Sequence, residues 1–248
     1  AFEAVEMVRS AVARGLPIRE VVRNLLTLRM WFENASPFLP SMEADVTSIY
    51  TSYWRTRVAD DRRQFGQPTA AADLSSVAGA LGIAMLALGS PELTVDVAAR
   101  HIAGDMVTGG SVNAMNELVR RGVLVRQRGR IRFFHQTLFE FAAAQGLQTR
   151  DPVETITVLA NRMTAQPDDL FVAAVMEQYL ILVAHDPAAA FAVAECLGAL
   201  LAHDQPALQD LALVVWAHHP ELNIPPQLFA NVSAVALRRF MLVAPTVA

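Results

Sequence analysis

Residues 118–147 read LVRRGVLVRQRGRIRFFHQTLFEFAAAQGL, and this stretch decides the fold of the middle of the chain. A helix-like segment runs into Gly122, and a short basic hairpin pattern follows it. The two strands are expected at 123–127 and 130–134, with a turn at Arg128-Gly129. The stretch therefore predicts a helix followed directly by a β-hairpin.

Another helix is expected to follow the hairpin. Thr137 and Glu140 have the T-x-x-E spacing of a capping box, in which two side chains bond backbone N–H groups at a helix start. This spacing places the start of the helix near His135 and gives Glu140 a capping role. Core packing is expected of three apolar residues at helical spacing, Phe134, Leu138 and Phe141.

Upstream of the hairpin, the apolar pattern predicts helices at 74–88, 95–102 and 112–121. Asp73 and Thr94 precede the first two as N-cap residues. Three helices and a hairpin in this order are typical of a winged helix, which we place at 73–150. Residues 64–72 contain glycine and proline and are expected to form a linker.

Residues 1–65 are expected to form a separate helical domain. Gly15 and Pro17 separate a first helix from a strongly apolar second helix at 18–32. A third helix is expected at 45–63, and its apolar stripe consists of Val46, Ile49, Tyr50, Tyr53, Trp54 and Val58.

The last part of the chain, 151–248, is expected to be helical with short proline-containing turns. A weak repeat ends three apolar runs: AHDP at 184–187, AHDQP at 202–206 and AHHP at 217–220. The repeats start about fifteen to eighteen residues apart, the length of one helix and a turn. This pattern predicts an α-solenoid-like array in which histidine lies near each helix C-terminus and proline stops the helix. The whole chain is thus expected to be mainly α, with one small β-hairpin.

Composition narrows the class of protein. The 248 residues are 53% hydrophobic and include 12 glycines, which favours a folded, core-rich chain. The net charge of −4 gives no general basic excess for nucleic acid. Cys196 is the single cysteine, which predicts a buried thiol in a reducing, cytoplasmic setting. No apolar run reaches the ~20 residues of a membrane span. The abrupt ends suggest a piece of a longer protein.

Catalytic signatures are missing from the sequence. It contains no G-x-x-x-x-G-K-[ST] phosphate loop, no G-x-G-x-x-G and no G-x-S-x-G elbow, so no catalytic residue is assigned and this segment is not expected to be an enzyme. The His-Asp pairs at 185–186 and 203–204 raise the alternative of a metal phosphohydrolase. Both pairs fall in the helix-ending repeat, and nothing else supplies converging ligands, so a structural role is favoured.

Arginines cluster around the hairpin: Arg120, Arg121, Arg126, Arg128, Arg130 and Arg132. The alternating spacing predicts that the last four share one face of the hairpin, opposite Val123, Val125, Ile131 and Phe133. They are candidates for phosphate contact, either to a nucleotide or to nucleic acid. The alternative is an ordinary solvated face.

DNA binding would also need polar residues on the third helix of the winged helix. Asn113 and Asn116 can read adenine there, whereas Glu117 repels phosphate. DNA is therefore the second candidate ligand.

The motif FFHQTLFEF at 133–141 resembles the end of the winged-helix domain in signalling P-loop NTPases of the STAND class, in their NACHT branch. A weaker stretch supports the same family. It consists of LTLRM at 26–30, Pro40, DVTSIY at 45–50 and YWRTRVAD at 53–60, in the order of the helical lid that follows the nucleotide core. The resemblance covers about 18–150 and leaves the tail unidentified.

The resemblance implies a role for His135 as the residue that faces the bound nucleotide and helps to hold the protein off. The family usually has a proline near position 25 that packs on adenine, whereas this chain has Leu25. Leu25, Leu26 and Met30 are the candidates for an apolar wall of the nucleotide pocket.

The same resemblance implies that the parent protein binds ADP or ATP with Mg²⁺ through a phosphate loop upstream of this chain. Its partners would be that nucleotide-binding core and an unknown trigger, protein or nucleic acid, without a membrane. Recognition of the trigger by the helical array would release the off state and drive homo-oligomerisation, in a bacterial antiviral defence role. Two alternatives stay open: a winged-helix DNA-binding regulator with a helical effector domain, and a plain helical scaffold.

Overall fold

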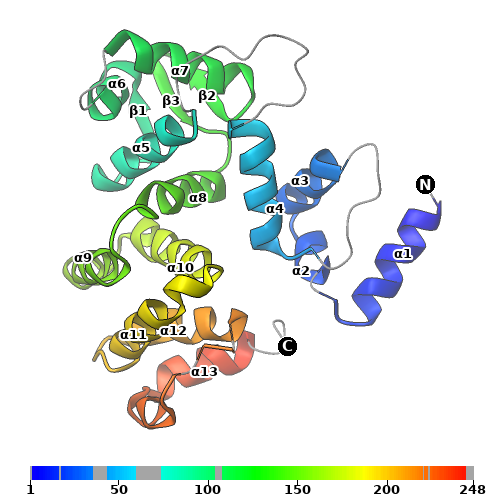
Figure 1. Cartoon of the computed structure of the whole chain (residues 1–248), viewed down its shortest axis with the longest axis vertical. Helices are drawn as coiled ribbons and strands as arrows, with labels where there is room; N and C mark the ends of the chain where they lie inside the picture. The colour runs from blue at the N-terminus through cyan, green and yellow to red at the C-terminus, as the bar shows by residue number, and fades with distance from the viewer. Residues whose placement is uncertain are drawn as a thin grey trace. The chain divides into compact units, whose positions relative to one another are not determined.

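The computed structural model describes residues 2–16, 18–35, 44–59, 74–103, 108–219, 221–222 and 224–243. The chain divides into two compact units, Ala1–Ser75 and Ser76–Val247, and each is described by itself. The fold is mainly helical with one small three-stranded antiparallel sheet (Figure 1). The expectation of a mainly α chain is therefore confirmed.

All regular elements in the described part of the first unit are helical. Its elements are α1 (Phe2–Ala13), α2 (Ile18–Arg23), α3 (Leu25–Ala35), α4 (Val46–Tyr53) and the π-helical segment η1 (Trp54–Ala59). Asp45 caps α4 by accepting a hydrogen bond from the backbone N–H of Ser48 at 2.6 Å. The predicted stripe supplies part of the core, with Ile49, Tyr50, Tyr53, Trp54 and Val58 buried. Residues 60–63, the linker at 64–72 and the predicted cap Asp73 lie outside the described residues.

The single helix predicted at 18–32 is wrong, because the segment forms two helices. Asn24 interrupts it, and the side-chain oxygen of Asn24 accepts a hydrogen bond from the backbone N–H of Leu26 at 2.8 Å. Thr27 adds to the break by donating from its hydroxyl to the carbonyl of Val21 at 2.6 Å. Side chains of these types compete with the helical backbone for its own hydrogen bonds. Asn24 therefore starts a new helix in an apolar run that otherwise reads as continuous.

The second unit begins with a helix–strand–helix–helix–hairpin order. Its elements are α5 (Leu74–Ala87), β1 (Glu92–Thr94), α6 (Val95–Ala103), α7 (Thr108–Arg120), β2 (Leu124–Gln127), β3 (Arg130–Phe133) and α8 (Gln136–Leu147). The sheet order is β1-β3-β2, antiparallel throughout. The predicted hairpin is confirmed, and Thr94 caps α6 through a 3.3 Å hydrogen bond from the backbone N–H of Val97. Strand β1 was not predicted from the sequence.

The predicted single face of arginines on the hairpin is wrong. Arg126 pairs across the hairpin with Ile131, whereas Arg132 pairs with Val125. Directly opposed residues lie on the same face of a sheet. Arg126 therefore shares the face of buried Ile131, while Arg130 and Arg132 lie on the other face together with half-buried Val125.

The hairpin turn explains this error. Arg128 and Gly129 form a two-residue loop in which both φ angles are positive, 51° and 76°, as in the tightest hairpins. Such a loop pairs Gln127 with Arg130, so even-numbered residues of β2 oppose odd-numbered residues of β3. A prediction in which the even-numbered residues of both strands share one face therefore places the side chains of one strand on the wrong face.

The helices α5 and α8 approach each other at backbone distance. A Cβ built on Gly82 would lie 2.5 Å from the backbone nitrogen of Ala143, and one built on Gly79 would lie 2.9 Å from the Cα of Gly146. No side chain fits at such a crossing, so α8 is held close against α5 by small residues on both helices.

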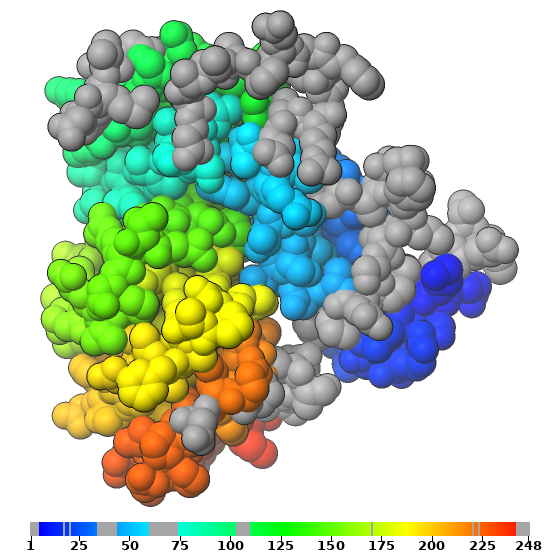
Figure 2. Space-filling model, viewed as in Figure 1, coloured from blue at the N-terminus to red at the C-terminus, as the bar shows by residue number. Residues whose placement is uncertain are grey.

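The rest of the second unit is a helical array. Its elements are α9 (Pro152–Ala165), α10 (Leu170–Ala184), η2 (Pro187–Ala189), α11 (Ala190–Leu201), α12 (Pro206–His218), η3 (Pro226–Asn231) and α13 (Ala234–Val243). Helices pack on their neighbours and on the next but one, as in α9–α11 and α10–α12. In Figure 2, α8 in green, α10 in yellow and α12 in orange follow one another down this unit. From Ser76 to Val247, the segments predicted as separate domains at 73–150 and 151–248 thus belong to one compact unit.

The predicted repeat marks helix ends, which is confirmed. The helices α10, α11 and α12 end at Ala184, Leu201 and His218. His185 bonds the carbonyl of Ile181 through Nδ1 at 2.8 Å, as expected of a histidine at a helix C-terminus. His203 differs, because its Nδ1 accepts from the backbone N–H of Gln205 at 3.0 Å and so serves the turn before α12.

Cys196 lies buried in α11, as predicted, and burial raises the pKa of its thiol to about 11. Among the described helices, none is by itself long and apolar enough for a membrane span. One pair, Phe171–Ala184 and Pro187–Leu201, reaches that length only in combination and is bent by 108°.

Candidate functional site

His135 stands at the junction of β3 and α8, where the chain leaves the sheet and starts a helix. It is the N-cap of α8, with extended backbone angles of φ −143° and ψ 147°. Its Nδ1 accepts a hydrogen bond from the backbone N–H of Thr137 at 3.2 Å. The side chain is exposed. His135 therefore performs the task that serine, aspartate or asparagine commonly performs at this position.

The capping bond settles which ring nitrogen of neutral His135 carries the hydrogen. Because Nδ1 accepts, the hydrogen must be on Nε2. The ring thus presents an N–H donor on the side opposite its capping bond, at the positive end of a helix.

The predicted capping box of Thr137 and Glu140 is wrong. The helix starts at Gln136, so Thr137 lies within the first turn instead of before it. Glu140 accepts a hydrogen bond from the side chain of Gln136 at 2.9 Å and is only 8% exposed. Burial raises the pKa of Glu140, and the hydrogen bond from Gln136 partly opposes that shift. Leu138 and Phe141 are buried, as predicted, and Phe134 is half-buried.

The four candidate arginines of the hairpin are exposed, but they differ in their partners. Arg126 donates to the side-chain oxygen of Asn116 at 3.2 Å. Arg130 forms an ion pair with Glu92 and also donates to its carbonyl at 3.3 Å. Arg128 and Arg132 have no hydrogen bond or ion pair within the described residues. These two are the arginines that keep their full capacity for an external anion.

The hairpin separates Arg128 from His135. Arg128 lies in the turn at one end of β3, and His135 follows the other end. At about 3.3 Å per residue, the four-residue strand alone spans about 13 Å. The turn and the helix start are therefore two places, and one phosphate cannot bridge both.

The helix α7 carries the candidate base-reading residues. Asn113 is exposed, while Asn116 is engaged by Arg126. Glu117 pairs with Arg120 and Arg121, and the hydrogen bond from Arg120, followed by that from Arg121, lowers its pKa to about 2. The carboxylate is thus ionised but largely neutralised by its own helix, which weakens the repulsion expected toward phosphate.

The three candidate wall residues of the first unit differ sharply in exposure. Leu25 is 83% exposed, whereas Leu26 is 8% and Met30 is 1% exposed. Leu26 and Met30 lie on the buried side of α3 and contribute to the core of that unit. Leu25, at the first position of α3, is the one that offers apolar surface to a ligand.

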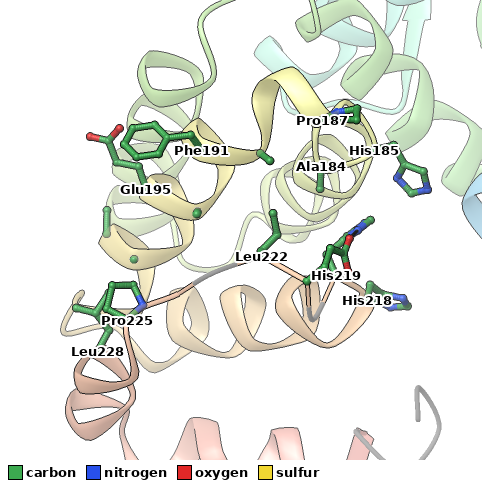
Figure 3. A pocket seen from close by; sticks show the side chains of 15 residues that line it. Ala184, His185, Pro187, Phe191, Glu195, His218, His219, Leu222, Pro225 and Leu228 are labelled. Carbon is green, nitrogen blue, oxygen red and sulfur yellow. Dashed lines mark hydrogen bonds and ion pairs between the residues drawn. The ribbon is translucent and has the colours of Figure 1, made fainter.

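A groove in the helical array was not predicted from the sequence. It has a volume of 1280 Å³ and lies between the ends of α10 and α12, the face of α11 and η3 (Figure 3). The repeated histidines were the available signal, because His185, His218 and His219 all line it. The repeat pattern by itself predicts only that these histidines lie at helix ends.

No group of three His, Cys, Asp or Glu side chains in the described part of the chain is arranged to hold a metal ion. In comparisons with known proteins, no family model, no curated protein and no solved structure matches the chain.

Proposed function

We propose that this chain is the regulatory part of a nucleotide-dependent signalling switch of the NACHT branch. In this proposal, 1–65 is the helical lid, 73–150 the winged helix and 151–248 the start of a sensor-type helical array. The order α5-β1-α6-α7-β2-β3-α8 with sheet order β1-β3-β2 supports the winged-helix assignment. The single observation that carries the proposal is the cap of α8, where His135 keeps an exposed N–H donor.

The chemistry of this position suits the terminal phosphate of ADP. A helix N-terminus attracts anions through its dipole and its free N–H groups. His135 adds a directed donor while its ring is held in place by the bond from Thr137. The upstream core would supply the phosphate loop and Mg²⁺. A contact made in the ADP state and lost after exchange for ATP biases a two-state equilibrium toward the off state.

In this proposal, the trigger shifts the same two-state equilibrium by binding to the helical array. The helices α9 to α13 pack on neighbours and next neighbours, the arrangement that stacked helical repeats use to present long binding surfaces. A trigger that binds better to the released state shifts the equilibrium, and oligomerisation follows. An antiviral role for the parent protein belongs to the same proposal.

His135→Ala in the parent protein is expected to weaken ADP retention about 10- to 100-fold, because a hydrogen bond to a charged group contributes ~1.5–3 kcal/mol. Basal activation should rise accordingly. The measurement is the ADP released on denaturing the purified protein, identified by chromatography. Unchanged ADP content and unchanged basal activity would count against the role of His135.

His135→Asn is the matched control for the cap. Asparagine is among the best N-cap residues, so it keeps the bond to Thr137 but lacks the far N–H of the imidazole. Both variants should therefore lose ADP, while only His135→Ala should also lose ~1 kcal/mol of helix stability. If instead His135→Asn retains ADP, and only the destabilised His135→Ala loses it, His135 is only a structural cap.

A winged-helix DNA-binding regulator is the second candidate, and it is favoured by Arg128 and Arg132, which have no partner among the described residues. In that case, Arg128→Gln with Arg132→Gln should weaken duplex binding and reduce the slope of log K against log salt by about 1.8, since each phosphate contact contributes about 0.9. Arg126→Gln, whose side chain already bonds Asn116, is the control and should change the slope less. Binding that does not depend on salt would exclude this candidate.

A further inference from the structure

The groove of the helical array has an apolar floor and one polar end. Figure 3 shows His185 and His219 at one end and Phe191 with Glu195 at the other. The floor along α11 consists of the small residues Ala190, Ala194 and Gly198. A Cβ on Gly198 would lie 3.1 Å from Leu228, so glycine at this position lets η3 close the lower side of the groove.

Phe191 marks the rim of the groove as a contact surface. Its side chain is 83% exposed on α11, although burial of a phenylalanine normally stabilises a fold. It lines the groove together with the apolar side chains of Leu222, Pro225 and Leu228. Contiguous apolar surface of this kind marks binding sites more often than a scattered exposed side chain does.

Two histidines, His185 and His219, form the polar end of the groove. His219 is 6% exposed and bonds the carboxylate of Glu221 through Nδ1 at 3.0 Å, which leaves Nε2 of the neutral ring as an acceptor. That Nε2 has no hydrogen-bond partner within the described residues, but it is buried, so a ligand in the groove does not reach it. His185 lies against it edge to face, with ring centroids 4.9 Å apart. Nδ1 of His185 donates to the carbonyl of Ile181, so Nε2 of its neutral ring is an acceptor, and this side chain is exposed.

Apart from three histidines, the ionisable side chains of the described groove lining are carboxylates. Glu221 and Glu195 contribute carboxylates, and the described lining contains no arginine. Glu195 is exposed and makes no hydrogen bond or ion pair with any described residue. The sequence contains no lysine, so arginine is the basic side chain that this chain could have placed there. A ligand that complements this surface carries a positive charge and hydrogen-bond donors.

We propose that the groove binds a segment of a partner protein in which an apolar side chain stands next to arginine or lysine. The apolar side chain would cover the floor at Ala194, and the cation would meet Glu195 and the face of Phe191. The volume of 1280 Å³ exceeds the ~300–1,000 Å³ of small-molecule pockets and suits several residues of a peptide. This inference goes beyond the nucleotide switch, because binding here requires no contact at His135.

The first test uses an array of random octapeptides probed with the 248-residue chain. Bound sequences should be enriched in arginine or lysine next to leucine, isoleucine or phenylalanine. Enrichment of acidic peptides, or the absence of any selected sequence, would overturn the proposal.

The selected peptide is then labelled and its affinity is measured by fluorescence anisotropy. Glu195→Arg should weaken binding about tenfold or more, since like charges in an interface are strongly disfavoured. Asp204→Arg is the matched control, with the same charge change at an exposed turn residue outside the groove. Equal effects of the two variants would show a general charge effect and overturn the assignment of the site.

Ala194→Trp fills the floor and should abolish peptide binding. If this variant fails to fold, Glu195→Arg at the exposed rim still decides the question. The last measurement is sedimentation of the unmodified chain in the absence of peptide. Concentration-dependent self-association that Ala194→Trp abolishes would show a second copy of the chain in the groove and overturn the assignment to a partner protein.

Discussion

Gly82→Ala is expected to destabilise the second unit by about 3 kcal/mol, at the upper end of the range for overpacked cores. The new Cβ would lie 2.5 Å from the backbone nitrogen of Ala143 and 2.8 Å from its Cα. Backbone atoms cannot rotate away as a side chain can, so α5 and α8 must separate. The loss of contact would then spread along the crossing, where Gly79 and Gly146 also meet.

Gly110→Ala is the matched control for this prediction. Gly110 is also a helical glycine, but nothing lies within 4 Å of the position of its Cβ. Alanine there should stabilise the chain by up to ~1 kcal/mol through its better helix propensity. Urea unfolding followed by circular dichroism measures both variants. A Gly82→Ala variant as stable as Gly110→Ala would mean that the two helices are not in backbone contact.

The hairpin shows how far a local pattern can predict. The two strands were predicted from the alternation of apolar residues and the turn from Arg128-Gly129. The pairing of the strands confirms both predictions. The face of each arginine depends on the number of residues in the turn, which shifts the parity between the strands. Strand β1 has only three residues and exists because it pairs with β3. Such a short strand has no periodic signal of its own.

The capping residue at a helix start could be predicted only where it is of a common type. Asp45 and Thr94 are cap residues of common type, and their positions were predictable. At α8 the cap is a histidine, while a threonine and a glutamate nearby imitate the usual motif. The predicted helix start near His135 agrees with the structure, whereas the predicted cap of Thr137 and Glu140 is wrong.

The candidate site residues also differ in whether the sequence alone could predict their surroundings. The position of His135 between strand and helix could be predicted because both elements are local. The burial of Leu26 and Met30 could not, since it depends on which side of α3 packs against the other helices. The groove at α11 is built by segments far apart in the sequence, from Ala184 to Leu228, and no local pattern describes it.

Glu177→Gln is expected to stabilise the chain by ~1–2 kcal/mol at pH 8, because a partly buried charge is removed. Glu177 is half-buried on α10 and has no hydrogen bond or ion pair with the described residues. Burial, with the negative charges of Glu140 and Asp210, raises its pKa from 4.5 to about 7. Each pKa unit corresponds to about 1.36 kcal/mol, and partial contact with water reduces the full value.

The sign of the effect gives the prediction its pH dependence. Because the folded pKa is above the unfolded one, protonated Glu177 favours the folded state, and this contribution is complete below pH 4.5. It declines as pH rises and is lost above about pH 7. The glutamine of the variant carries no charge at any pH, so urea unfolding should show little difference near pH 4.5 and the full gain at pH 8. Glu195→Gln, at an exposed position without partners among the described residues, is the control and should change stability by less than ~0.5 kcal/mol at both pH values. A gain for Glu177→Gln that is equal at both pH values would come from packing instead of charge.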